Sequence, residues 1–171
     1  MFTVFVPGNP APQGSKRHVG RGIMLESSKR VGPWRDRVRA AVDRARAQSS
    51  LRIEGAVLAT LEFIMPRPER TPKTRFVFAT KKPDVDKLLR AVCDALSDQK
   101  GRGKRKVEGV IRDDSQVVLT LAVKRLARKG EEPGCLVTLK ELTSEAEMQH
   151  CLAILRELTG KAGPQLMPEA A

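Results

Sequence analysis

The chain has 171 residues, 40% of them hydrophobic, and a formal net charge of +12. This length supports one domain with a hydrophobic core, and the charge predicts a polyanionic partner, nucleic acid before an anionic membrane. The aromatic content of 4%, with one Trp and no Tyr, argues against a protein dominated by base-stacking platforms. Apolar runs such as AVLATLEFIM are too short to span a bilayer.

The cysteine and histidine content excludes two common kinds of site. Cys93, Cys135 and Cys151 do not have the spacing of a zinc site, so we expect reduced, apolar cysteines in a cytosolic protein. His18 and His150 are far apart in the chain, which argues against a histidine-based nuclease or metal site.

The first part of the chain predicts strand, loop, helix and strand. Residues 2–6 form a strand, and the glycine-, proline- and basic-rich residues 7–22 predict a mobile loop. A helix is predicted from Pro33 to residue 48, and residues 53–65 alternate like a strand. The helix has an apolar stripe at helical spacing, formed by Trp34, Val38, Ala41, Val42 and Ala45.

The middle of the chain predicts a second helix between two basic loops. Residues 66–83 are rich in proline and basic residues, with a short strand predicted at 76–78. A helix follows from residue 84 to about 97, before a glycine-punctuated basic loop over 98–109. One face of this helix is apolar and contains Val85, Leu88, Leu89, Val92 and Leu96.

The last part predicts a hairpin and a third helix. Residues 116–125 form the clearest strand, and residues 135–140 are its predicted hairpin partner. The helix begins with a capping box, Ser144 and Glu147, and ends at Gly160. The apolar face predicted for the first strand consists of Val117, Leu119, Leu121 and Val123.

These elements, in the order β-α-β-(β)-α-β-β-α, predict a small α/β (α+β) domain with helices packed on a mixed sheet. We expect residues 1–142 to form this domain, residues 143–160 an appended C-terminal helix, and residues 161–171 a disordered tail.

Two aspartates bracket a valine at the start of the second helix. Pro83 disfavours helical geometry at the residue before it, so we expect Asp84 at the N-cap and Asp86 in the first turn. Aspartates at a helix start cap free N–H groups and suit the helix dipole, which is a structural explanation. Only one residue can be the N-cap, however, so Asp86 needs a further reason.

A second acidic pair, Asp113–Asp114, precedes the apolar strand at residues 116–125, where it contributes little to folding. Carboxylates suit Mg²⁺, which prefers hard oxygen ligands. Such a site serves phosphodiester hydrolysis, and a basic rim would attract the DNA. Strand alternation places Asp113 on the apolar face and Asp114 on the other, unless the chain bends before Gln116.

The stretches KPDVDKLLRAVCDAL and RDDSQVV together resemble the RusA family of Holliday-junction endodeoxyribonucleases, including phage-borne relatives. The resemblance is strong over residues 82–124, and the opening FVPGNPAPQGSKR is more loosely similar. It implies a homodimeric resolvase, active with Mg²⁺ or Mn²⁺, that cuts two strands of a four-way DNA junction symmetrically. It also implies a location in the bacterial cytoplasm or a phage-infected host cell.

Carried over by position, the family's essential acids fall on Asp84, Asp86 and Asp114, and its catalytic basic residue falls on Arg90. Asp113 is kept as a second choice of metal ligand, and Asp94 also matches an acidic position.

Two positions depart from the family pattern. Lys87 stands where Asn is frequent, and Arg90 stands where Lys is found. Arginine keeps the charge but does not donate a proton at ordinary pH, so we assign Arg90 charge stabilisation.

Basic residues near the acids and in the loops form the predicted DNA-binding set. Their phosphate contacts would give salt-dependent, largely sequence-independent affinity. A two-fold dimer would present two aligned sites to a branched substrate. The set consists of Lys16, Arg17, Lys73, Arg75, Lys87, Arg102, Lys104, Arg105 and Lys106.

The sequence leaves other functions open. A non-catalytic DNA-binding protein could keep this fold with its acids serving as caps and salt bridges. The intact Asp84, Asp86 and Asp114 favour the nuclease, and the departures at Lys87 and Arg90 keep this alternative open. A basic RNA-associated protein is a weaker alternative, because aromatic or RNA-module motifs are missing.

Overall fold

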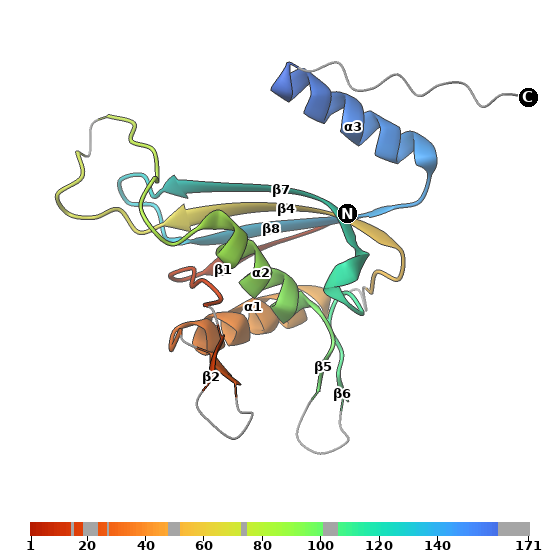
Figure 1. The fold of residues 1–171 in the computed structure, drawn as a ribbon, viewed down its shortest axis with the longest axis horizontal. Coiled ribbons are helices and arrows are strands. Elements are labelled where there is room, and N and C mark those ends of the chain that lie inside the picture. The colour runs from red at the N-terminus through yellow and green to blue at the C-terminus, as the bar shows by residue number, and fades with distance from the viewer. Residues whose placement is uncertain are drawn as a thin grey trace, which may run out of the picture. The chain divides into compact units, whose positions relative to one another are not determined.

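The computed structural model describes residues 1–14, 16–18, 24–26, 28–47, 52–72, 75–100 and 106–160, with the side chains of residues 16–18, 24–26, 100 and 106 left out. The chain divides into two compact units, Met1–Glu141 and Leu142–Ala171 (Figure 1). No helix among the described residues is long and apolar enough to cross a membrane.

The first unit is built on a four-stranded mixed sheet with the strand order β1-β8-β4-β7. Its strands are β1 (Phe2–Pro7), β4 (Ala56–Met65), β7 (Val117–Leu126) and β8 (Gly134–Leu142). β1 runs antiparallel to β8, and β4 runs parallel to β7. The predicted small α+β domain with a mixed sheet is confirmed.

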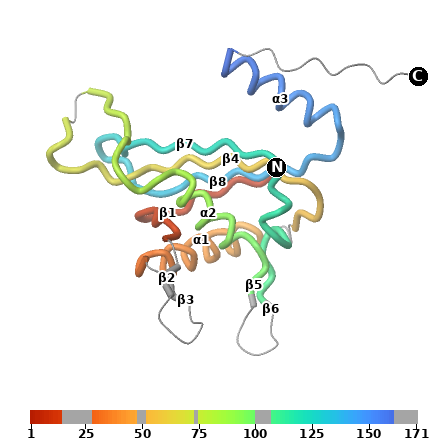
Figure 2. The backbone as a smooth tube through the Cα atoms, viewed as in Figure 1, coloured from red at the N-terminus to blue at the C-terminus, as the bar shows by residue number. Residues whose placement is uncertain are grey.

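Helices α1 (Val31–Arg46) and α2 (Val85–Leu96) lie together on one face of this sheet (Figure 2). Trp34 and Val38 from α1, and Leu88 and Val92 from α2, are fully or almost fully buried in the shared core. The predicted apolar stripes are therefore confirmed in their central residues. Ala45, at the end of the α1 stripe, is exposed instead.

Two short hairpins extend from regions predicted as loops. β2 (Lys16–His18) pairs with β3 (Met24–Glu26), and β5 (Gln99–Lys100) pairs with β6 (Lys106–Val107). Both are antiparallel and only two or three residues long, which is too short for a clear alternation of apolar residues.

The neighbours of β8 differ from the prediction. We expected residues 135–140 to pair with the preceding strand, but β8 lies between β1 and β4, while β7 is an edge strand beside β4. The parallel β4–α2–β7 crossover places β7 on the far side of β4. The β7–β8 connection must therefore pass β4, which a local hairpin pattern does not reveal.

β7 carries a bulge at Val118, because its register with β4 shifts between Val117 and Leu119. A bulge reverses which side chains face the core: Val117 packs against the core before it and Ala122 does so after it. The single apolar face predicted for this strand is therefore wrong. Leu121 and Val123, beyond the bulge, are exposed.

The second unit contains α3 (Glu145–Thr159), with Ser144 as its N-cap and Gly160 as its left-handed C-cap. Ser144 Oγ accepts a hydrogen bond from Glu147 N at 3.3 Å, as predicted. The Glu147 carboxylate reaches one residue further back than a capping box requires, and accepts from Thr143 N at 2.8 Å. The predicted tail, residues 161–171, is outside the described residues.

Candidate functional site

The N-terminus of α2 lies at the carboxyl ends of the parallel strands β4 and β7 (Figure 1), which is where open α/β sheets commonly bind ligands. Asp84 is the N-cap residue, with extended backbone angles (φ −74°, ψ 145°), as predicted. Its side chain makes no capping hydrogen bond. Helix capping therefore does not account for the Asp84 carboxylate, which is directed elsewhere.

Lys87 is the partner of the Asp84 carboxylate. Lys87 Nζ lies 2.9 Å from Asp84 Oδ2, and both side chains are about half exposed, at 45% and 46%. The hydrogen bond from Lys87 lowers the pKa of Asp84, and the same contact raises the pKa of Lys87, with a smaller contribution from Asp86. Asp84 and Asp86 thus act on one ammonium group at the start of the helix.

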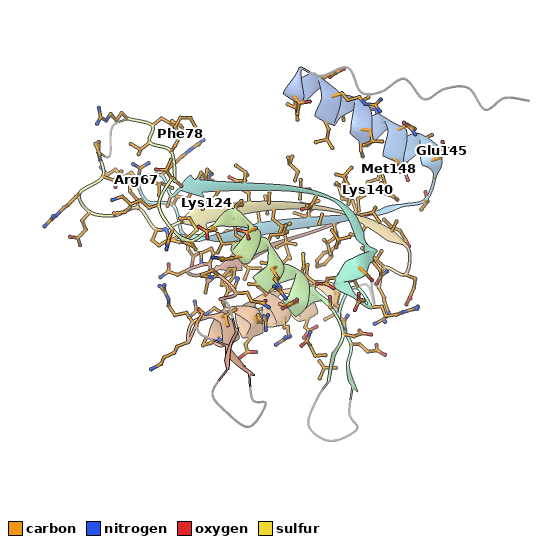
Figure 3. The ribbon with its side chains drawn as sticks, in the orientation of Figure 1. Arg67, Phe78, Lys124, Lys140, Glu145 and Met148 are labelled. Carbon is orange, nitrogen blue, oxygen red and sulfur yellow. The ribbon has the colours of Figure 1, made fainter. Side chains whose placement is uncertain are left out.

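Lys124 holds the chain in place where it enters α2. Its Nζ donates to the backbone oxygen of Lys81 at 2.9 Å and to that of Pro83 at 2.7 Å. Figure 3 shows Lys124 near the end of β7, and its charge further lowers the pKa of Asp84. Lys124 could not be predicted as part of the site, because the bulge in β7 reverses which side chains of the strand face α2 and so turns Lys124 toward it.

Further along α2, Arg90 and Asp94 have different surroundings. Arg90 is exposed, one turn after Asp86 on the same side of the helix. Asp94 forms an ion pair with Arg35 of α1, which also donates to the amide oxygen of Gln13. Asp94 therefore has a structural partner that joins the two helices.

The described part of the predicted mobile loop is packed against α2. Gln13 N donates to Lys87 O at 3.0 Å, and Gly8 N donates to Pro133 O at 2.8 Å. Ala11 and Gln13 are buried. The expectation of a loose loop is wrong for residues 7–14, because proline and glycine indicate irregular backbone and do not report whether that backbone is buried.

The second acidic pair lies on a short 3₁₀ turn, η1 (Asp114–Gln116). Asp113 is its N-cap, and Asp113 Oδ1 accepts a hydrogen bond from Ser115 N at 3.0 Å. Hydrogen bonding to the side chain of Ser115, and then to its backbone, lowers the pKa of Asp113. Among the described residues, the Asp114 carboxylate makes no hydrogen bond or ion pair. This turn bends the chain before β7, so strand alternation does not extend back to these acids.

Gln116 fixes η1 against the rest of the domain. Its Oε1 accepts from the backbone N–H groups of Arg112, at 2.6 Å, and Asp113, at 3.2 Å. Its Nε2 donates to the backbone oxygens of Ile53, at 3.2 Å, and Gly55, at 2.9 Å. One amide thus joins the turn to the segment that enters β4. Gln116 is part of the stretch RDDSQVV, but nothing in the sequence pattern indicates this role.

Asp114 lies beside the third turn of α2. Burial raises the pKa of the Cys93 thiol to about 12, and the charges of Asp114 and Asp94 add to that shift. Cys93 is seven positions after Asp86, or about 10 Å along a helix axis. Within the described part of the chain, no three His, Cys, Asp or Glu side chains come close enough to hold a metal ion.

The donor chemistry at the start of α2 fits a divalent cation. Mg²⁺ is commonly held by one or two carboxylates together with waters and substrate phosphates. Asp84 and Asp86 offer hard oxygen ligands that no helix cap occupies, and they already attract the ammonium group of Lys87. An incoming metal ion would have to compete with that ammonium group.

The predicted DNA-binding residues are only partly described. Arg75 is exposed, and Lys87 is paired with Asp84. Lys16 and Arg17 lie in β2, and Lys106 lies in β6, without described side chains. The remaining predicted residues are outside the described part: Lys73, Arg102, Lys104 and Arg105.

The short strand predicted at residues 76–78 is not formed. Phe78 makes only an isolated antiparallel bridge with Arg125 at the end of β7. Phe76 and Phe78 are both exposed, so their alternation does not reflect burial on a sheet, which is what β-type patterns normally report.

The chain matches the model of a known protein family. A family model described as Endodeoxyribonuclease RusA matches residues 7–140, well over half of the chain. No curated protein matches the chain significantly. The matched range includes α1, α2, η1, β7 and most of β8, and it ends before α3.

Proposed function

The chain belongs to the RusA family of endodeoxyribonucleases, and from this premise we propose that it is a metal-dependent nuclease that resolves four-way DNA junctions by paired, symmetric cuts. The observation that carries the proposal is the state of Asp84. It occupies the N-cap position of α2, yet its carboxylate is turned to a cation instead of to the helix.

Asp84 and Asp86 are the proposed metal ligands. When bound, Mg²⁺ or Mn²⁺ would neutralise phosphate charge and make a bound water more acidic. The two carboxylates have a second effect on DNA: without a cation they repel the phosphate backbone, so they link DNA binding at this point to metal binding.

Asp114 is the further acid of the proposal. Its carboxylate makes no hydrogen bond or ion pair among the described residues, whereas the Asp113 carboxylate caps the 3₁₀ turn. We therefore favour Asp114 over Asp113 as the further acid of the site, at a position about two helical turns along α2 from Asp86.

Arg90 supplies positive charge without proton transfer, since a guanidinium stays protonated at ordinary pH. It is exposed on α2 one turn after Asp86, from where its charge can stabilise the phosphate as negative charge develops on it.

Paired cleavage needs two sites on one substrate, and a homodimer supplies them by symmetry. The basic loops then contact the DNA arms through phosphates, which gives affinity that depends on salt more than on sequence. The mass of the free protein in solution, measured by light scattering, tests the dimer directly.

The decisive experiment uses a synthetic four-way junction with each strand labelled in turn. With Mg²⁺ or Mn²⁺, the wild type should give symmetric nicks in two opposing strands. Asp86→Asn should bind the junction and leave it uncut, because it loses one ligand charge without altering a helix cap. Asp43→Asn is the matched control, since Asp43 is an exposed aspartate that pairs with Arg46 on α1; it should cut like the wild type.

Two results would contradict the proposal in different ways. Equal cutting by the wild type and Asp86→Asn would remove Asp86 from the site. Junction binding by the wild type without cutting, in either metal, would favour the non-catalytic DNA-binding function, in which Lys87 has permanently taken the place of the cation.

A further inference from the structure

Two phenylalanines stand in solvent on the loop that leads into α2. Phe76 and Phe78 are 73% and 75% exposed, and their rings pack edge to face with centroids 4.8 Å apart and planes at 87°. The other aromatic side chains are less exposed: Trp34 and Phe63 are almost completely inaccessible, Phe2 is 7% exposed and Phe5 is 38% exposed. Leaving two aromatic rings in water is costly, so this pair is a candidate binding surface.

The loop that carries the pair is anchored at several points. Phe78 is bridged to Arg125 of β7, and Figure 3 shows Phe78 on this loop near the end of that strand. Arg125 is itself held by Glu62 of β4 and, through two hydrogen bonds of 2.6 Å, by Glu131. The rings are therefore presented on a supported backbone.

The beginning of the loop is supported as well. Arg67 Nε donates to Ala127 O at 2.9 Å, and Arg67 Nη1 donates to Pro72 O at 2.8 Å. Near the other end of the loop, Lys124 binds the backbone oxygens of Lys81 and Pro83. A supported loop loses little conformational entropy when it binds, which favours a rigid contact.

The charge around the rings indicates the kind of partner. Residues 66–83 contain six lysines or arginines and one acid, Glu69. Aromatic rings among cations are the combination that binds nucleic-acid bases by stacking while contacting the phosphates. An apolar protein partner would not need this excess of positive charge.

Phe78 lies close in sequence to the proposed metal ligands, six positions before Asp84. A groove of about 290 Å³ has Phe78, Lys81 and Pro83 in its lining, so the ring and the residue that precedes Asp84 border the same groove. A base stacked on the phenylalanine pair would therefore belong to a nucleotide near the cleavage site.

We propose that Phe76 and Phe78 form a wedge that enters the branch point of a four-way DNA junction and stacks on the bases exposed there. In continuous duplex the bases are already stacked on each other, and a wedge must first separate them. At a branch point that stacking is interrupted, so the wedge gains contacts without the full cost. This role rests on the proposed junction nuclease and adds to it a device for selecting branched over linear DNA.

The test compares wild type, Phe76→Ala/Phe78→Ala and Leu158→Ala, with Ca²⁺ in place of Mg²⁺ to prevent cutting. Leu158 is a matched control because it is an apolar residue of similar exposure, 69%, outside the loop. Junction affinity of the double variant should fall by about 5- to 150-fold, as expected for the loss of base–aromatic stacking. Its affinity for linear duplex should not change, and Leu158→Ala should match the wild type on both substrates.

A fluorescent base analogue, 2-aminopurine, placed at the branch point gives an independent reading. The wild type should change its fluorescence on binding, and the double variant should not, even at saturating protein. Thermal unfolding should be unchanged, since both rings are exposed.

The possible outcomes test the wedge and the proposed junction nuclease separately. If the wild type prefers and cuts junctions while the double variant is equally selective and gives the same fluorescence change, the wedge is wrong and the nuclease stands. If the wild type binds junctions no better than duplex, the junction function fails and the wedge fails with it. An equal loss on junction and duplex would also overturn the wedge, because it would indicate a general contact with DNA.

Discussion

Lys87 is the residue on which the chemistry of the site most depends. Its ammonium group is 2.9 Å from Asp84 Oδ2, and its charge also interacts with Asp86. The family pattern that the sequence resembles often has asparagine at this position, which brings no charge to the acids. A lysine there lowers the pKa of Asp84, and it would compete with the proposed metal ion for the same oxygen.

We predict that Lys87→Asn binds Mn²⁺ more tightly than the wild type. Exposed ion pairs are weak, so removing the competing ammonium should tighten binding by only about 1.5- to 5-fold. Calorimetric titration of the DNA-free protein with Mn²⁺ measures this. Lys81→Asn is the control, because it removes an equal charge from a side chain that makes no ion pair with Asp84 or Asp86 among the described residues. Weaker or unchanged binding in Lys87→Asn would show that the lysine does not compete with metal.

At this scale the sequence predicted the position of Asp84 but not its partner. Pro83 and the helical spacing were sufficient to place Asp84 at the N-cap. The direction of the carboxylate depends on a lysine three residues later, since capping and ion pairing are both available to an aspartate there. The choice between Asp113 and Asp114 likewise depends on a backbone turn that a strand pattern does not encode.

At the scale of elements, the short turn η1 matters because it carries Asp114 and makes few hydrogen bonds within itself. Three residues of 3₁₀ helix provide few hydrogen bonds. The Gln116 amide compensates by joining four backbone groups from two segments. Gln116 is thus a positioning residue for the acidic turn.

We predict that Gln116→Ala lowers the rate of junction cutting much more than it weakens junction binding. Leaving backbone groups without their partners costs roughly 1–3 kcal/mol in stability, and the turn should then sample other positions. Single-turnover cleavage, binding in Ca²⁺ and thermal unfolding should be measured together. Gln149→Ala on α3 is the control and should resemble the wild type. Normal cleavage by a destabilised Gln116→Ala protein would show that the amide serves folding alone.

The helices were predictable where the apolar residues recur with a strong helical period. Which strands lie side by side in the sheet was not predictable. α1 and α2 were placed within about two residues because their apolar stripes face one core. The pairing of β8 with β1 and β4, and the bulge at Val118, are set by contacts distant in sequence. The alternation of Phe76 and Phe78 predicts a strand that does not form. An alternating apolar pattern predicts a sheet strand, but it does not show whether a sheet covers those side chains, and here both are exposed.

At the scale of the whole molecule, the net charge is +12, and the basic residues differ in whether they are paired with acids or exposed without such a pair. Several arginines are committed to ion pairs inside the domain: Arg35 with Asp94, Arg52 with Asp98, and Arg125 with Glu62 and Glu131. These pairs connect helices and strands of the domain, so these arginines contribute little of the charge that could attract a partner. Exposed cations that lie outside these ion pairs include Arg75, on the loop that leads into α2, and Arg44 on α1.

This distribution predicts which cations set the salt dependence of junction binding. Each phosphate contact contributes about one unit to the slope of log affinity against log salt. Arg75→Ala should therefore reduce that slope by about one and weaken duplex and junction equally. Arg44→Ala removes the same charge from an exposed position on α1, away from the proposed site, and should leave the slope unchanged. Fluorescence anisotropy at several salt concentrations, in Ca²⁺, measures both. If the two variants change the slope equally, affinity follows net charge and not a defined basic surface; if only Arg75→Ala does, the DNA lies along the loop that leads into α2.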